Sequence, residues 1–217
     1  MKEQTVYPRP VAAPLRFLAT LVSYLFHPIF LVPMMAAYLI YGVPELYLGV
    51  PPDLKFKRLI IITVNVVFYP LFALVLMKGL GFIKSIHLRS PKDRIAPYIV
   101  TLTCYFWAWM VVRSFPDTPV QMIAMIFGVF LATSGGLVIN SFIKISMHAI
   151  GVGGLITFML IMAYSSGVAL PLTLSVLIAG LVFTARMMVS DHTDRELITG
   201  FVVGILGQVI GFLVFAR

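Results

Sequence analysis

The chain has 217 residues, of which 60% are hydrophobic and 11% charged, and its mean hydropathy is +1.02. These proportions exclude a disordered chain and a water-soluble globular domain, because water cannot solvate so apolar a surface. The formal net charge is +8, but the charges stand between apolar runs and form no basic stripe, so we expect membrane-surface loops and no nucleic-acid partner. The single cysteine, Cys104, excludes an internal disulfide and a cysteine-based metal cluster.

Seven apolar runs follow one another along the chain. Lipid offers the backbone no hydrogen bonds, so each run is predicted to be a membrane-spanning helix that satisfies its own amides. Pro28 and Pro33 in the first run predict a kink or a partly re-entrant segment. The predicted fold class is all-α, a polytopic transmembrane helix bundle with a six-helix core and an extra N-terminal span. The predicted spans are 17–41, 59–77, 96–112, 120–139, 149–164, 168–185 and 197–216.

The number of crossings decides which loops share a membrane face. With seven crossings, the face that holds the N-terminus, here called side A, also holds loops 78–95, 141–148 and 186–196. A re-entrant first run would move only the N-terminus and leave the three loops together. Side A carries eleven of the sixteen lysines and arginines and three of the four histidines. The positive-inside rule makes side A cytoplasmic, unless several of these cations are there to bind a ligand.

The most informative stretch connects the sixth and seventh spans. Arg186 is followed six residues later by His192, and Glu196 comes four residues beyond His192. On a helix this last spacing puts both side chains on one face, where the carboxylate can accept a proton from one imidazole nitrogen and leave the other as a nucleophile. The planar, permanently charged guanidinium of Arg186 suits bidentate capture of phosphate. The alternative is that arginine and histidine at span ends merely extend to the membrane interface.

This stretch resembles the third signature of the type-2 phosphatidic acid phosphatase superfamily, S-R-x5-H-x3-D. Arg186 and His192 match at the right spacing, Glu196 stands where aspartate is usual, and Ala185 replaces the serine. Gly200 also fits the way such sequences continue. The resemblance implies that Arg186 binds phosphate, that His192 attacks phosphorus and that Glu196 orients His192.

A second stretch, Ile145-Ser146-Met147-His148, resembles the P-S-G-H signature of the same family with Ser and His retained. In that family the serine donates to the phosphate and the histidine protonates the leaving oxygen as a general acid, which suits an imidazole. The resemblance therefore implies these roles for Ser146 and His148. The alternative is that His148 is a structural residue at a helix end.

The first signature of the family, K-x6-R-P, is not met. The chain reads Arg94-Ile-Ala-Pro97, and His87 stands where the lysine is expected. Arg94 is the candidate for the arginine of the family, and Arg89 is a candidate for a further phosphate contact. Lys84 and Lys92 are interpreted as ordinary basic loop residues.

The resemblance extends from Lys84 to Gly200. It implies an N-terminal segment with the first span at residues 1–56 and a six-helix phosphatase-like membrane core at 57–217. Neither a metal-binding motif nor a phosphate-binding loop is found, so we expect no metal and no cofactor. The expected catalytic residues are His192, His148 and Glu196, and the expected phosphate-binding residues are Arg186, Arg94, Ser146 and Arg89.

These observations predict an enzyme that hydrolyses a lipid phosphate or pyrophosphate through a phosphohistidine. We expect a lipid phosphate substrate, membrane lipids as surroundings and a bacterial inner membrane as location, with the face of the site open. A lipid phosphotransferase and a non-catalytic membrane protein with a degenerate site are the alternatives.

Two further features are interpreted as structural. The glycines of the last span, from Gly200 to Gly211, predict close helix packing within the bundle, with a homodimer face as the alternative. His27, between Phe26 and Pro28, is interpreted as a core histidine.

Overall fold

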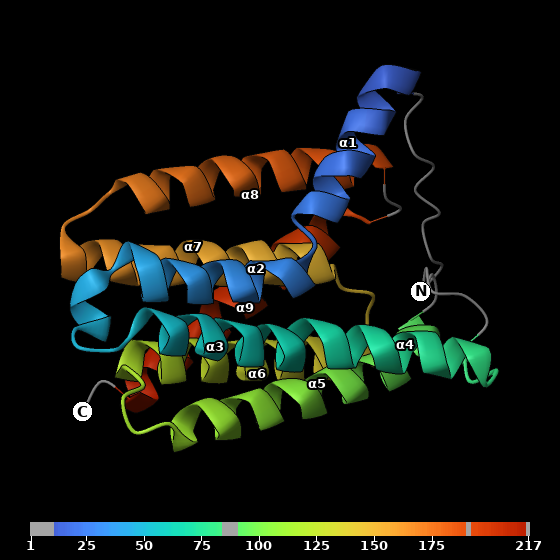
Figure 1. The fold of residues 1–217 in the computed structure, drawn as a ribbon. Helices are drawn as coiled ribbons and strands as arrows, with labels where there is room; N and C mark the ends of the chain where they lie inside the picture. Colours follow the sequence, from blue (N-terminus) through green and yellow to red (C-terminus); the bar gives the residue numbers. More distant parts are fainter. Residues whose placement is uncertain (1–10, 84–90, 190–191, 216–217) are drawn as a thin grey trace.

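The computed structural model describes residues 11–83, 91–189 and 192–215 (Figure 1). Regular structure in these residues is helical, with no β-strand among them, which confirms the predicted all-α class. Six helices in this part of the chain are long and apolar enough to cross a membrane, or seven spans if a bent N-terminal pair counts as one. The protein is therefore a multi-pass membrane protein.

The spans agree with the predicted runs, but four of the six begin earlier, because polar and capping residues extend these helices beyond their apolar stretches. The first of the six, Pro52–Gly79, also contains a π-helical turn, η3 (Val64–Phe68). The predicted domain boundary at 56/57 falls inside this span. The helices are α3 (Pro52–Thr63), α4 (Tyr69–Gly79), α5 (Pro91–Ser114), α6 (Val120–Asn140), α7 (Met147–Ser166), α8 (Leu170–Val189) and α9 (Asp194–Phe215).

The N-terminal pair, α1 (Ala13–Leu25) and α2 (Pro28–Ala37), is bent by 54°. Pro28 is the first residue of α2, where its missing N–H and fixed φ are tolerated, whereas it could not continue α1. Figure 1 shows α2 running with the bundle while α1 turns away from it toward α8, against which it packs. Two short helices, η1 (Tyr38–Gly42) and η2 (Pro44–Tyr47), lead from α2 to α3.

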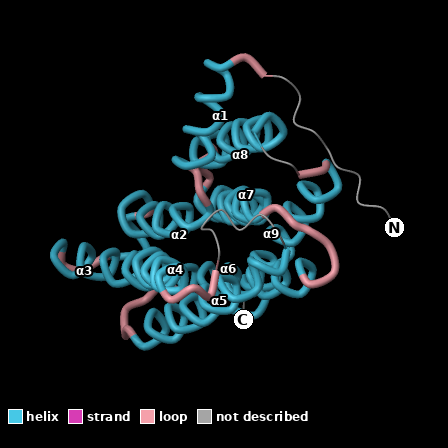
Figure 2. Tube along the Cα trace, turned by 90° about the vertical axis from the view of Figure 1, so that its right-hand side faces the viewer, coloured by secondary structure: helices cyan, strands magenta, loops and turns pink. Residues whose placement is uncertain are grey.

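The central helix of the bundle is α7. Figure 2, which looks along the bundle, shows α7 surrounded by α2, α8 and α9, and α7 packs against each of them. On its other side, α9 packs against α6. Buried apolar side chains of α2, α5, α6 and α7 form the main core.

The contact between α7 and α9 depends on glycine. A Cβ added to Gly204 would overlap the Ile150 carbonyl, and a Cβ on Gly153 would overlap the Phe201 carbonyl. A Cβ added to Gly211 would lie 2.7 Å from backbone atoms of Gly128 in α6. The glycine face of α9 is therefore used for close packing within the bundle, as the sequence predicts. It brings the beginnings of α7 and α9 together.

Candidate active site

The beginning of α9 holds His192 through a helix cap. Thr193 precedes the helix and Glu196 is its third residue, so the two form a capping box. The Thr193 N–H donates to Glu196 Oε2, and the Glu196 N–H donates to Thr193 Oγ1, each at 3.3 Å. The same Glu196 oxygen accepts a hydrogen bond from His192 Nδ1 at 2.7 Å.

The predicted hydrogen bond between His192 and Glu196 is thus confirmed, but its geometry differs from the expectation. His192 does not lie on the helix, because α9 begins two residues later at Asp194. The cap, and not a shared helix face, brings the carboxylate to the ring. Since Nδ1 donates to the carboxylate, the lone pair of the neutral imidazole lies on Nε2.

The beginning of α7 lies directly against the beginning of α9. Ser146 caps α7, because its hydroxyl accepts from the Ala149 N–H at 3.4 Å, and the Ser146 N–H donates to the Glu196 carbonyl at 3.4 Å. Gly200 packs against the Ser146 carbonyl, where a Cβ would stand 2.7 Å away. The positive ends of two helix dipoles therefore meet here, which favours an anion.

Ser146 itself is completely buried. Its hydroxyl is engaged as a helix cap, so the structure assigns it a role in shaping the beginning of α7. A direct contact between Ser146 and phosphate stays a prediction.

Arg94 reaches the same place from the first turns of α5. Its Nη1 donates to the Ile145 carbonyl at 3.0 Å, and only 9% of the residue is exposed. The bond orients the guanidinium beside the residue that precedes Ser146. A carbonyl carries no formal charge, so this bond positions the cation without neutralising it.

His148 is the second residue of α7 and is held from a distant part of the chain. Its Nε2 lies 3.0 Å from the carbonyl oxygen of Ser23 in α1, 125 residues away in sequence. A carbonyl can only accept, so Nε2 carries the hydrogen and Nδ1 is the nitrogen that can exchange a proton. The ring of His27 packs edge-on against His148, with centroids 5.0 Å apart and planes at 85°.

Arg186 lies in the last turn of α8, within electrostatic range of both His27 and His148. His192 is likewise within electrostatic range of His148. The imidazoles of His27, His148 and His192 and the guanidiniums of Arg94 and Arg186 are thus gathered at one end of the bundle.

The structure brings together all but one of the residues predicted for the site. Arg89 lies outside the described residues. Sequence reasoning missed His27 and the Ser23 carbonyl, which both contact His148. The sequence feature that could have indicated a role for His27 is its place directly before Pro28, a residue that breaks a helix.

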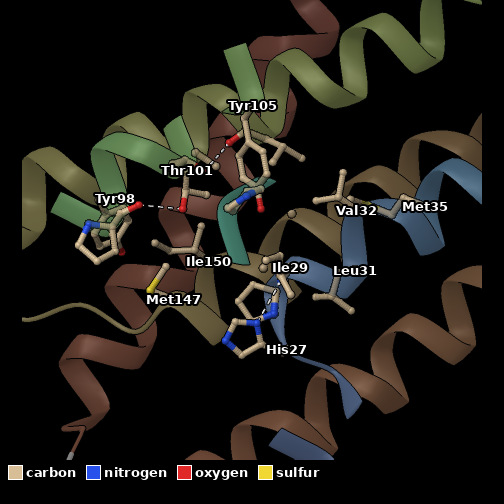
Figure 3. Close-up of a pocket in the computed structure, with 18 of the residues that line it drawn as sticks. His27, Ile29, Leu31, Val32, Met35, Tyr98, Thr101, Tyr105, Met147 and Ile150 are labelled. Carbon is tan, nitrogen blue, oxygen red and sulfur yellow. Dashed lines mark hydrogen bonds between the residues drawn. The ribbon is translucent and has the colours of Figure 1, made fainter. Parts of the chain in front are cut away.

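A largely apolar cavity of about 180 Å³ lies inside the bundle beside the candidate site, and none of the described residues predicted for the site lines it. Figure 3 shows His27 and Met147 on one side of it, with Tyr98, Thr101 and Tyr105 across from them. His27 therefore belongs both to this cavity and to the surroundings of His148.

Two polar groups among the lining residues have no hydrogen-bond partner in the described part of the chain. They are the hydroxyl of Tyr98 and Oε1 of Gln208, and both residues are 99% buried. Both atoms are inaccessible to solvent, so the accessible walls of the cavity are mainly apolar.

Among the described residues, no three His, Cys, Asp or Glu side chains gather as metal ligands would. Comparison of the chain with models of protein families, with curated proteins and with solved structures finds no match.

Proposed function

We propose that the protein is an integral membrane phosphatase that hydrolyses a lipid phosphate or pyrophosphate through a phosphohistidine, as its motifs predict. The observation that carries the proposal is the 2.7 Å hydrogen bond between His192 Nδ1 and Glu196, placed against the capped beginning of α7. It gives a histidine the tautomer needed for attack, beside groups that favour an anion.

In the first step, the Nε2 lone pair of His192 attacks phosphorus and the bond between phosphorus and the ester oxygen breaks. The positive charge that develops on the imidazole is stabilised by Glu196, whose carboxylate already accepts the Nδ1 hydrogen. The half-buried, capped position of Glu196 keeps that partner in place before substrate arrives, so little reorganisation is needed.

The phosphoryl oxygens would be bound by Arg94 and Arg186, with the positive ends of α7 and α9 adding to the field. Phosphoryl transfer proceeds through a loose transition state that depends mainly on positioning and on positive charge. Arg94 is positioned for this by its bond to the Ile145 carbonyl.

His148 would give a proton from Nδ1 to the leaving alcohol oxygen. Because Nε2 is engaged with the Ser23 carbonyl, this acid is the imidazolium form, which the negative charge of the bound phosphate would stabilise beside Arg186 and which becomes neutral as the alcohol departs. In the second step the neutral Nδ1 takes a proton from water as the water oxygen attacks the phosphohistidine. Phosphate and unmodified His192 result, and His148 regains its proton.

The substrate is proposed to be an amphiphile, because the site lies at the end of a membrane bundle and has an apolar cavity beside it. The phosphate would stay at the polar end while part of an apolar chain enters between the helices.

We place the protein in a bacterial inner membrane as a prediction from sequence. Labelling of a cysteine introduced at the exposed Arg195 with an impermeant reagent reports which face holds the site.

The test is phosphate release from a panel of lipid phosphates by purified protein in detergent. His192→Asn keeps an N–H donor for Glu196 but removes the nucleophile, so we expect loss of turnover by about 10⁴-fold or more. Asp194→Asn, an exposed acid in the same turn, is the matched control and retains activity. A base-stable phosphoryl group on His192 after a rapid quench supports the intermediate.

Full activity of His192→Asn would overturn the mechanism, and loss of activity with a chelator would overturn the metal-free reaction. An acceptor alcohol added to the assay separates the two chemistries, since a phosphotransferase yields the phosphorylated acceptor in place of free phosphate.

A further inference from the structure

The bend between α1 and α2 exposes a backbone carbonyl at the candidate site. In a continuous α-helix, the His27 N–H would donate to the Ser23 carbonyl. Instead, the His27 N–H donates to the Tyr24 carbonyl at 3.3 Å, and Pro28 has no N–H to continue the ladder. The Ser23 carbonyl is thereby released from the backbone pattern of the helix.

His148 uses this released carbonyl. Its Nε2 approaches the Ser23 oxygen to 3.0 Å, and Ser23 is buried within α1, which packs on α8. A backbone acceptor on a packed helix is a fixed point, so the bond sets both the tautomer and the direction of the His148 ring.

His27 adds a second restraint. Its Nδ1 accepts from the Ile29 N–H at 3.4 Å as the cap of α2, which holds the His27 ring in one orientation. That ring packs edge-on against His148, with centroids 5.0 Å apart, and so blocks rotation of the imidazole. The hydrogen bond fixes one nitrogen, and the ring contact fixes the plane.

We propose that the bend at His27 and Pro28 is a part of the active site that holds His148 as the proton donor, with His27 as a positioning residue. This inference rests on the proposed function. The inference assigns a role to the N-terminal segment, which the sequence motifs place outside the catalytic core. It also makes the bend necessary for the departure of an alkoxide but not for the attack on phosphorus.

The test uses two substrates that differ in their need for an acid. The alkoxide of an alkyl phosphate is a poor leaving group and requires protonation, whereas p-nitrophenyl phosphate releases p-nitrophenolate, which is a stable anion. Pro28→Ala restores an N–H and lets α1 continue, so that the residue 27 N–H reclaims the Ser23 carbonyl. We expect turnover of the alkyl phosphate to fall by about 10²-fold and that of the aryl phosphate to change less than about threefold.

Pro33→Ala is the matched control, because Pro33 lies inside the same helix α2 without breaking it. We expect this variant to hydrolyse both substrates as the wild type does. His27→Asn is the second variant, since asparagine keeps the cap of α2 but lacks the ring, and we expect a selective loss of roughly tenfold on the alkyl phosphate. In a His148→Ala background neither variant should lower alkyl phosphate turnover further, because the group they position is gone.

An equal loss on both substrates would mean that the bend is only structural, and no loss on either would mean that His148 is positioned otherwise; each result overturns the inference. Nitrogen NMR of the histidine rings provides a readout independent of turnover. If the wild type carries the hydrogen on His148 Nε2 and Pro28→Ala does not, the positioning contact is supported even when no lipid phosphate is hydrolysed. Absence of wild-type turnover refutes the proposed function alone.

Discussion

The beginnings of α9 and α7 each present a histidine to the same region, but they hold it by different means. At α9, His192 is bound by Glu196, four residues away, through a carboxylate that also caps the helix. At α7, His148 is bound by the Ser23 carbonyl, 125 residues away, and by the ring of His27. One imidazole is oriented by local sequence and the other by the tertiary fold.

The kind of partner differs as well. A carboxylate stabilises positive charge on a ring, which suits a nucleophile that becomes a cationic phosphohistidine. A neutral carbonyl fixes the tautomer and stabilises the cation much less, which suits an acid that must release its proton. The difference in partners therefore agrees with the two roles proposed for the rings.

Removal of the charge at the local partner should have the largest effect. Glutamine is accepted in a capping box, so Glu196→Gln leaves the beginning of α9 folded while the charge beside His192 disappears. We expect turnover of every phosphate ester to fall by roughly 10²–10⁴-fold, whatever its leaving group. Phosphate release is measured beside Asp194→Asn, and a loss restricted to alkyl esters would assign Glu196 to the wrong histidine.

Arg94 tests whether the beginning of α7 also binds phosphate. Lysine retains the charge but lacks the several N–H donors with which a guanidinium can bind the Ile145 carbonyl and a phosphate at once. Arg94→Lys should therefore raise KM about tenfold. Arg113→Lys, in the last turn of the same helix beside Trp109, should leave KM unchanged. Equal KM values for the two variants would remove Arg94 from the site.

Separating the two helix beginnings should affect both histidines together. A methyl group at Gly204 overlaps the Ile150 carbonyl, so Gly204→Ala should push α9 from α7 and lower the free energy of unfolding by about 1–3 kcal/mol. Gly180→Ala of α8, where a Cβ meets nothing within 4 Å, should be neutral or slightly stabilising. Thermal unfolding in detergent provides the measurement, and a Gly204→Ala protein as stable as Gly180→Ala would contradict the close contact.

The smallest effect is expected at the cap itself. Thr193→Ala removes the hydroxyl that accepts the Glu196 N–H, which should lower the free energy of unfolding by about 1 kcal/mol, while Thr193→Ser should restore it. The Glu196 carboxylate would keep its bond to His192, so activity should fall far less than in Glu196→Gln. A loss of turnover as large as that of Glu196→Gln would show that the cap, and not the charge, is what His192 requires.

The sequence predicted the fold class and the spans well, because lipid allows a long apolar run only one solution. It also predicted the pairing of His192 with Glu196, because a contact across four residues depends little on the rest of the fold. The surroundings of His148 could not be predicted in this way. His27 was interpreted as a core histidine, since its contact with His148 arises only when the bend in the N-terminal pair is placed against α7.

The arrangement of α9 has a consequence for how the protein is assembled during synthesis. α6 and α7 contact each other little and are joined mainly through α9, which follows both of them in the chain and fills the space between them. In a nascent chain that has inserted only as far as α8, the helix that joins α6 to α7 is therefore still missing. Gln208 and the glycine face of α9 can pack between them only afterwards. Under the proposed function, the site would be complete only once α9, which carries Glu196, has packed against α6 and α7, so a partly translated protein would not hydrolyse the lipids of its own membrane.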